Sequence, residues 1–280
     1  MTLFEAIVLG LVQGLAEFLP VSSSGHLAVL QYIFGIRGEE VLIFAVMLHF
    51  GTFLSLVAVY YKDLYMLIKE LFATLTDIVT GKGLQINKND YRKLGVMIVV
   101  ATIPTAFFGI VFSDAFGAMY NSLLSIGIGF LITGTLLWWV EKFGKGKKNT
   151  GDMLFRDAFL VGLFQSAAIA PGISRSGATI AGGLFSNFNR DLAVRFAFLV
   201  SIPPILGAVI LESPNAFEQG MDIALMLPIV VGVIVAAVSG FIAIKTMIKI
   251  VSKKKLHFFS YYTWLLGFVV VVYAVANNIG

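Results

Sequence analysis

Long apolar stretches alternate with short polar segments along the 280 residues of the chain. A helix that crosses a bilayer needs about 20 apolar residues. Six stretches are predicted to be full transmembrane spans, at residues 41–61, 94–112, 120–140, 193–211, 223–244 and 258–276. Two more apolar segments, 3–36 and 158–186, are each interrupted near the middle, so neither arm is long enough to cross. The pattern predicts an all-α polytopic membrane protein with six full spans and two broken-helix hairpins.

The polar segments between the spans carry their own predictions. Residues 62–93 are mixed in charge and carry apolar residues at helical spacing, which is typical of an amphipathic helix on a membrane surface. Residues 114–120 are predicted to form a short loop and 212–222 an acidic one. Residues 245–257 are predicted to form a basic loop.

The composition supports insertion into a membrane. Hydrophobic residues make up 58% of the chain and charged residues 13%, and no soluble domain needs so much apolar surface. The absence of cysteine excludes disulfides and thiol chemistry. A net charge of +4 would suggest nucleic acid for a soluble protein, but the basic residues lie between spans, so no nucleic-acid partner is expected. The first residues lack a basic start and a small-residue cleavage site, so no signal peptide is predicted.

The second hairpin is interrupted by an arginine between two serines, with glycines on either side. A charged side chain at membrane depth costs roughly 2.5–3.5 kcal/mol on insertion scales. A proline–glycine pair ends one helix, and Ser174 or Ser176 can cap the next. The free N–H groups at that helix start, together with Arg175, would bind a phosphate. The alternative is a kinked helix whose arginine reaches a lipid headgroup.

The first hairpin is interrupted in the same way, after Pro20. A shift of 152 residues, which places Ser22 on Ser174, superimposes the two hairpins without a gap. The matching pairs are Gly10 and Gly162, Leu11 and Leu163, Gln13 and Gln165, Ala16 and Ala168, Ser22 and Ser174, Ser24 and Ser176, Gly25 and Gly177, Phe44 and Phe196, and Ala45 and Ala197. This register predicts an internal duplication.

Lysine and arginine indicate which side each segment faces. Segments 62–93, 141–157 and 245–257 hold six, five and five basic residues, whereas 113–120 and 212–222 hold none. Basic residues favour the cytoplasmic side, so Met1 and Gly280 are predicted to be extracytoplasmic. Each hairpin must then be re-entrant, and the two enter from opposite sides.

These sides predict an inverted repeat. Residues 1–140 form the first repeat and 158–280 the second, joined by a cytoplasmic linker at 141–157. Each repeat holds one re-entrant hairpin and three spans. The broken tips are expected to meet inside the bilayer and to line a cavity there.

Two polar motifs point to a family. They read Gln13-x-x-x-Glu17 with Pro20-Val21-Ser22-Ser23-Ser24-Gly25-His26, and Pro171-Gly172-x-Ser174-Arg175-Ser176-x-x-Thr179. Both closely resemble the undecaprenyl pyrophosphate phosphatase family of the bacitracin-resistance type, and the resemblance covers essentially the whole chain. The family's first motif admits glutamate or glutamine at its first position. This chain has Gln13, so a second carboxylate beside Glu17 is absent.

The resemblance implies an integral membrane hydrolase that converts a polyprenyl diphosphate to the monophosphate and inorganic phosphate. Such an enzyme recycles the lipid carrier for peptidoglycan and cell-wall synthesis, and therefore supports cell shape. It also confers resistance to bacitracin, an antibiotic that acts indirectly by sequestering the substrate. The implied location is the bacterial plasma (inner) membrane, among its lipids, with the active site open to the extracytoplasmic side. A homodimer is left open.

The main alternative is a transporter or flippase of a phosphate-bearing lipid that uses the same cavity. Inverted repeats with broken helices are typical of secondary transporters. A base beside a hydroxyl favours the enzyme, because a site that only binds its ligand has no need for that pair.

If the chain is an enzyme, the polar residues of the two tips can be given roles in the reaction. Glu17 is predicted to be a ligand for a divalent cation, Mg²⁺ or Ca²⁺, that accompanies the phosphate, or a general base. Ser23 is the expected nucleophile, ahead of its neighbouring serines and activated by Glu17 or His26, with direct attack by water as the alternative. His26 is expected to shuttle a proton, and Arg175 to clamp the phosphate.

The remaining tip residues are predicted to bind substrate, and they are Gln13, Ser22, Ser24, Ser174, Ser176 and Thr179. His49 lies within the span 41–61. A lone histidine in a span is more often satisfied by a neighbouring helix than catalytic.

Overall fold

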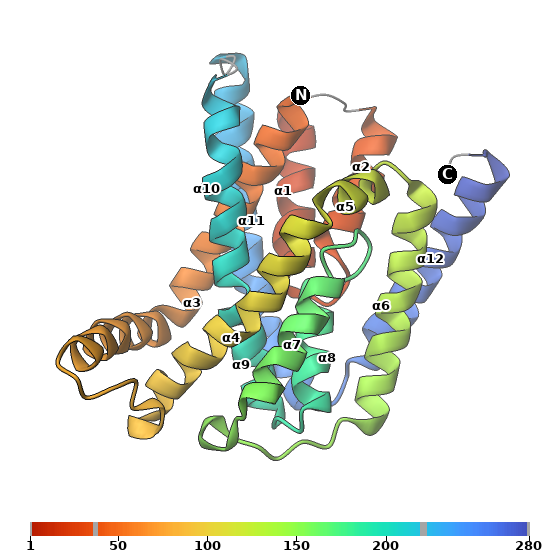
Figure 1. The fold of residues 1–280 in the computed structure, drawn as a ribbon. Coiled ribbons are helices and arrows are strands. Elements are labelled where there is room, and N and C mark those ends of the chain that lie inside the picture. The colour runs from red at the N-terminus through yellow and green to blue at the C-terminus, as the bar shows by residue number, and fades with distance from the viewer. Residues whose placement is uncertain (1, 36–38, 219–222, 279–280) are drawn as a thin grey trace.

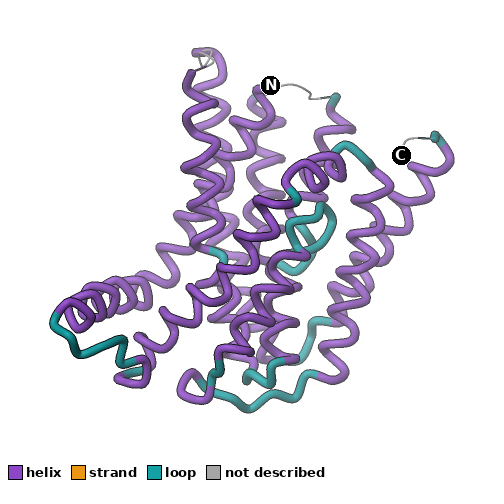
Figure 2. Tube along the Cα trace, in the orientation of Figure 1, coloured by secondary structure: helices purple, strands orange, loops and turns teal. Residues whose placement is uncertain are grey.

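The structure is a computed structural model that describes residues 2–35, 39–218 and 223–278. These residues form α-helices, two short 3₁₀ turns and no strand, so the all-α prediction is confirmed (Figures 1 and 2). Among them, six helical segments are long and apolar enough to cross a membrane. They are Phe44–Val79, Asp90–Val111, Leu123–Phe143, Arg190–Ile210, Met226–Ser252 and His257–Ala276. The chain is a multi-pass membrane protein.

Two helix pairs turn in the interior of the bundle. Helices α1 (Leu3–Phe18) and α2 (Ser23–Phe34) run from one end of the molecule to a turn near its middle and back. Helices α7 (Phe155–Ala167) and α8 (Arg175–Phe185) do the same from the opposite end (Figure 1). The arrangement agrees with two broken-helix hairpins. Their re-entrant character and the inverted repeat stay predictions.

The turns of the two pairs touch each other. The Ser176 hydroxyl donates a hydrogen bond of 3.1 Å to the carbonyl oxygen of Leu19. A Cβ added at Gly177 would lie 3.2 Å from the Cβ of Pro20. Residues 157 positions apart therefore meet at one place inside the bundle.

Several helices do not coincide with the predicted segments. Helix α3 (Glu39–Val79) does not stop at residue 61, but continues through a bend at Tyr60 into the predicted amphipathic segment. Helix α5 (Ser113–Tyr120) occupies the predicted loop 114–120, where Asp114 in the first turn favours a helix start. Only the helical character of residues 62–79 is confirmed, and their position on a membrane surface stays a prediction.

The second half departs from the predicted layout at two places. The predicted span 193–211 is two helices, α9 (Arg190–Val200) and α10 (Ile202–Glu218), which meet at Ser201. Pro203 and Pro204 fall in the first turn of α10, where backbone N–H groups have no intrahelical partner anyway. Helix α10 also replaces most of the predicted acidic loop, of which residues 219–222 lie outside the described residues.

The last two helices also differ in length from the prediction. Helix α11 (Ile223–Ser252) extends through much of the predicted basic loop because Met247 and Val251, one turn apart, are both fully buried. Helix α12 (His257–Ala276) follows the prediction closely. The linker is shorter than predicted, since α6 (Leu123–Phe143) and α7 extend into it from both sides.

Helix α1 is held against α11 by close backbone contact. A Cβ added at Gly10 would lie 2.6 Å from the carbonyl oxygen of Gly232, and one at Gly14 would lie 2.5 Å from that of Ala236. Small residues let two membrane helices approach in this way. The contact fixes the helix that carries Gln13 and Glu17.

The topology prediction can be tested with introduced cysteines, since the chain has none. The start of α1 and the end of α12 lie at one end of the molecule, and the linker between α6 and α7 lies at the other (Figure 1). Lys147→Cys is expected to label only after the membrane is permeabilised, and Asn278→Cys to label from outside in intact cells. Labelling of both from the same side would overturn the predicted orientation.

Candidate functional site

A cavity of about 650 Å³ lies where the two turns meet. Helices α1, α2, α3, α4, α5, α7, α8 and α10 contribute to its wall. Part of the wall is apolar, with Leu27, Val46, Ile169, Ile205 and Val209. Among the described residues that line it, Glu17 and Arg175 carry the formal charges. The cavity therefore combines a small polar site with space for an apolar group.

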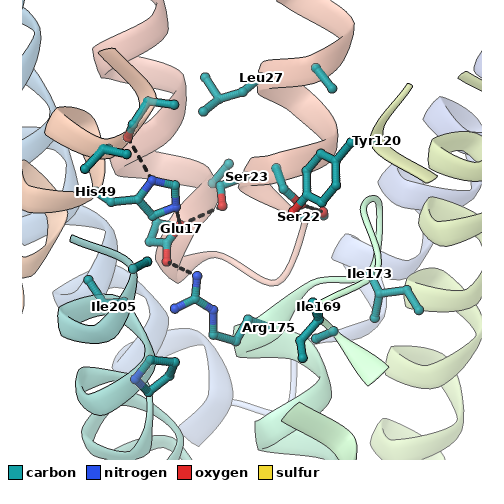
Figure 3. A pocket seen from close by; sticks show the side chains of 18 of the residues that line it. Glu17, Ser22, Ser23, Leu27, His49, Tyr120, Ile169, Ile173, Arg175 and Ile205 are labelled. Atoms are coloured by element: carbon teal, nitrogen blue, oxygen red, sulfur yellow. Dashed lines mark hydrogen bonds and ion pairs between the residues drawn. The ribbon is translucent and has the colours of Figure 1, made fainter. Parts of the chain in front are cut away.

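Glu17 is the centre of the polar site, and its side chain is 4% exposed. Its Oε2 accepts hydrogen bonds from the Ser23 hydroxyl at 2.6 Å and from Nε2 of Gln13 at 3.0 Å. Nη2 of Arg175 lies 3.2 Å from Oε1, and Nε2 of His49 lies 3.8 Å from Oε2. Figure 3 shows the Ser23 hydroxyl, the imidazole and the guanidinium all turned toward this carboxylate. Side chains from helices α1, α2, α3 and α8 thus meet at one carboxylate.

Ser23 is positioned by an unusual start of α2. Ser22 is the N-cap, and its hydroxyl accepts a hydrogen bond from the backbone N–H of Gly25. Its φ of +69° lies in the left-handed region that a serine rarely adopts. Strained backbone of this kind is typical of functional sites. Ser23 follows as the first residue of α2, next to the free N–H groups of the helix start.

Arg175 is positioned in the same manner as the first residue of α8. Ser174, one of the two predicted caps, is the N-cap, and its hydroxyl accepts a hydrogen bond of 3.1 Å from the N–H of Gly177. The positive ends of two helices and one guanidinium therefore lie near the cavity. Such a site favours an anion with several oxygens, most simply a phosphate group.

The other predicted substrate-binding residues fall into two groups. Ser22 and Ser24 line the cavity. The remaining hydroxyls are engaged elsewhere: that of Ser174 caps α8, that of Ser176 binds Leu19, and that of Thr179 donates to Arg175 O in its own helix. Gln13 is fully buried and contacts Glu17 rather than the cavity. Substrate contact by Ser174, Ser176 and Thr179 stays a prediction that this geometry does not support.

His26 lies away from the cavity. Its Nδ1 is 2.7 Å from the carbonyl oxygen of Ser22, and its Nε2 is 2.7 Å from the Tyr262 hydroxyl of α12. Its ring also stacks on that of Tyr262 and contacts Phe130 edge-on. Both nitrogens are therefore engaged, and the position favours support of the turn over proton transfer.

His49 takes the place in the cavity that His26 was expected to have. It lines the wall, and its Nδ1 lies 2.8 Å from the carbonyl oxygen of Ala45 one turn earlier, so Nε2 faces Glu17. From the sequence, His49 was expected to be structural, because a lone histidine in a span is more often satisfied by a neighbouring helix than catalytic. Tyr120 and Asn121 also line the cavity and were not predicted.

The donors for a divalent cation are few but chemically suitable. Oε1 of Gln13 is buried with no hydrogen-bond partner beside the Glu17 carboxylate. A carboxylate and an amide oxygen are hard ligands of the kind that Mg²⁺ and Ca²⁺ take, usually with oxygens of a bound phosphate. No group of three or more histidine, cysteine, aspartate or glutamate side chains among the described residues could hold a metal. The residues fit a cation that shares its ligands with a substrate.

Comparison with known proteins places the chain in a family. The model of the family described as bacitracin resistance protein BacA matches residues 6–269. A protein of Alkaliphilus metalliredigens (strain QYMF) named undecaprenyl-diphosphatase is 50% identical over 274 residues, which cover 98% of this chain and 99% of the relative. A protein of the same name from Carboxydothermus hydrogenoformans is 41% identical over 280 residues, covering 99% and 100%. One from Methanosphaera stadtmanae is 34% identical over 276 residues, covering 98% of each. The chain belongs to the bacitracin resistance protein BacA family.

Proposed function

We propose that this chain is an undecaprenyl-diphosphatase, which hydrolyses the lipid diphosphate to undecaprenyl phosphate and inorganic phosphate. Its full-length similarity to relatives of that name supports the assignment. The observation that carries it is the 2.6 Å hydrogen bond from the Ser23 hydroxyl to Glu17 in a cavity that also holds Arg175. A hydroxyl against a carboxylate, beside a guanidinium, is the arrangement that attack on phosphorus requires.

In the first step, Glu17 accepts the proton of Ser23 as Oγ attacks the terminal phosphorus. The bond from that phosphorus to the bridging oxygen breaks, and the lipid monophosphate leaves. Water then attacks the phosphoserine, releasing one proton to the solvent, while Glu17 returns its proton to Oγ. The products of this second step are hydrogen phosphate and free Ser23.

Arg175 and the two helix starts stabilise the charge on the phosphoryl oxygens. A guanidinium has five N–H donors, so its contact with one oxygen of Glu17 leaves donors for the diphosphate. When substrate binds, the pairing of Arg175 with Glu17 also holds both side chains close to Ser23. Phosphoryl transfer needs mainly such positioning and charge stabilisation.

The apolar part of the cavity accounts for a lipid substrate, because it offers space for the first isoprene units beside the polar site. Tyr120 and Asn121, at the end of α5, line the cavity on the side where α1 begins and α12 ends. With the predicted orientation, that side is extracytoplasmic, in a bacterial inner membrane. Bacitracin would then act on the substrate and not on this protein.

Phosphate release from the purified protein in detergent tests the proposal. With undecaprenyl or farnesyl diphosphate as substrate, one inorganic phosphate is expected for each lipid monophosphate formed. A transporter that uses the same cavity would release none in detergent. The absence of both products with correctly folded protein would reject the phosphatase.

Activity is also expected to depend on Mg²⁺ or Ca²⁺. Glu17 and the Gln13 amide oxygen would hold the cation, which would neutralise charge on the diphosphate oxygens when bound. Treatment with excess chelator is expected to abolish phosphate release, and returning either ion to restore it. Full turnover in chelator, with no metal found by elemental analysis, would contradict the prediction.

A further inference from the structure

The turn that precedes Arg175 is held by a residue of another helix. Thr133 of α6 is 1% exposed, and its hydroxyl donates to the carbonyl oxygen of Gly172 at 2.9 Å. The same hydroxyl accepts a hydrogen bond of 3.0 Å from the backbone N–H of Ser174. One buried side chain therefore satisfies two backbone groups of a turn that lacks regular helical hydrogen bonds.

The packing at this contact is close enough to fix the turn. A Cβ added at Gly129, one turn before Thr133, would lie 2.7 Å from the Cα of Gly172 and would collide with the carbonyl oxygen of Pro171. Gly172 has a φ of +83°, and a Cβ there would collide with the carbonyl oxygen of Ile126. The surface of α6 from residue 126 to 133 thus packs closely against the turn and fixes its shape.

The position of Arg175 depends on this packing, because Arg175 is the first helical residue after the turn. Its Nη2 reaches the Glu17 carboxylate at 3.2 Å, and Glu17 in turn holds Ser23. Thr133 contacts none of these side chains among its described hydrogen bonds. A shift of the turn would nevertheless move the guanidinium relative to the other two.

We propose that Thr133 is a positioning residue for the reaction, and that it acts through Arg175. The inference rests on the proposed phosphatase function, in which Arg175 clamps the diphosphate. Without the hydroxyl, the carbonyl oxygen of Gly172 and the N–H of Ser174 lose their buried partner. The turn then relaxes, and the guanidinium leaves the place where charge develops. Misplacement by about 1 Å can lower the rate of an enzyme roughly a hundredfold.

Two substitutions at this position separate the hydroxyl from the shape. Thr133→Val keeps the shape but removes the hydroxyl, and it is expected to lower kcat by roughly tenfold to a hundredfold. Thr133→Ser keeps the hydroxyl, and it is expected to stay within about threefold of the wild type. A loss with serine as large as that with valine would overturn the inference.

The matched control is Thr263→Val. Thr263 of α12 is also fully buried, but among the described residues its hydroxyl donates only to backbone oxygens of its own helix, at Phe259 and Ser260. Its replacement is expected to leave kcat unchanged at a similar melting temperature. Equal losses in the two valine variants would indicate a general packing effect and reject a specific role for Thr133.

Binding of farnesyl methylene-diphosphonate, which cannot be hydrolysed, tests whether Thr133 acts through Arg175. Thr133→Val is expected to weaken binding roughly fivefold in the wild-type background. In an Arg175→Ala background, it is expected to change the Kd by less than about twofold, because the guanidinium it positions is gone. Additive losses would reject the coupling. Absence of phosphate release by the wild-type protein would instead reject the proposed phosphatase function.

Discussion

Ser23→Ala is expected to lower turnover by about a thousandfold or more, because it removes the attacking oxygen itself. Glu17 and Arg175 remain in place, so binding of a diphosphonate analogue is expected to change by only a few fold. The contact that predicts this result is the 2.6 Å hydrogen bond between the Ser23 hydroxyl and Oε2 of Glu17. The measurement is phosphate release at saturating lipid diphosphate, alongside titration with the analogue.

Ser24→Ala is the matched comparison for this prediction. Ser24 lies in the same turn and lines the same cavity, but its hydroxyl lies 3.3 Å from that of Ser22. The loss of turnover in Ser24→Ala is expected to be much smaller than in Ser23→Ala. Acid quenching during turnover should trap a phosphoserine at Ser23 that mass spectrometry can locate. Near wild-type turnover of Ser23→Ala would instead indicate direct attack by water.

Arg175→Lys is expected to lower kcat/KM by about a hundredfold while the fold is retained. Lysine keeps the positive charge, but it lacks the planar fork that binds two oxygens of a phosphate at once. It also loses the geometry that reaches Oε1 of Glu17 from the start of α8. Loss of a preorganised donor to the developing charge commonly costs 10²–10³ in rate.

Arg156→Lys serves as the control for this substitution. Its side chain is 81% exposed near the start of α7, far from the cavity lining. The control is expected to keep full activity and the same melting temperature. Wild-type turnover of Arg175→Lys would remove Arg175 from the phosphate site.

The sequence was sufficient to predict the elements that carry the site. Serine caps correctly indicated where α2 and α8 begin, and Pro20 follows closely on the end of α1. The Pro171–Gly172 pair did not mark the end of α7, which ends earlier, at Ala167. The grouping of Glu17, Ser23 and Arg175 was also predicted, because the two broken tips were expected to meet inside the bilayer.

Other features depend on contacts that no local pattern contains. His26 stands inside a serine-rich motif, yet the structure turns its ring toward Tyr262, 236 positions away. His49 has no motif, but α3 brings it to Glu17. The break at Ser201 was hidden because an apolar run that contains two prolines resembles one continuous span with a kink. Thr133 belongs to no sequence motif, because its partners are backbone atoms of a distant turn.

The contact between Leu19 and Ser176 has a consequence for the biogenesis of the protein. It joins residues 157 positions apart, so the first turn has no partner until the second turn has been synthesised. At about 5–20 residues per second, that interval is on the order of ten seconds. During it, Glu17 has neither its arginine nor a closed cavity, and an incomplete chain carries no working active site. Hydrolytic activity therefore reports on completed insertion, and a chain truncated in the linker is inert rather than partly active.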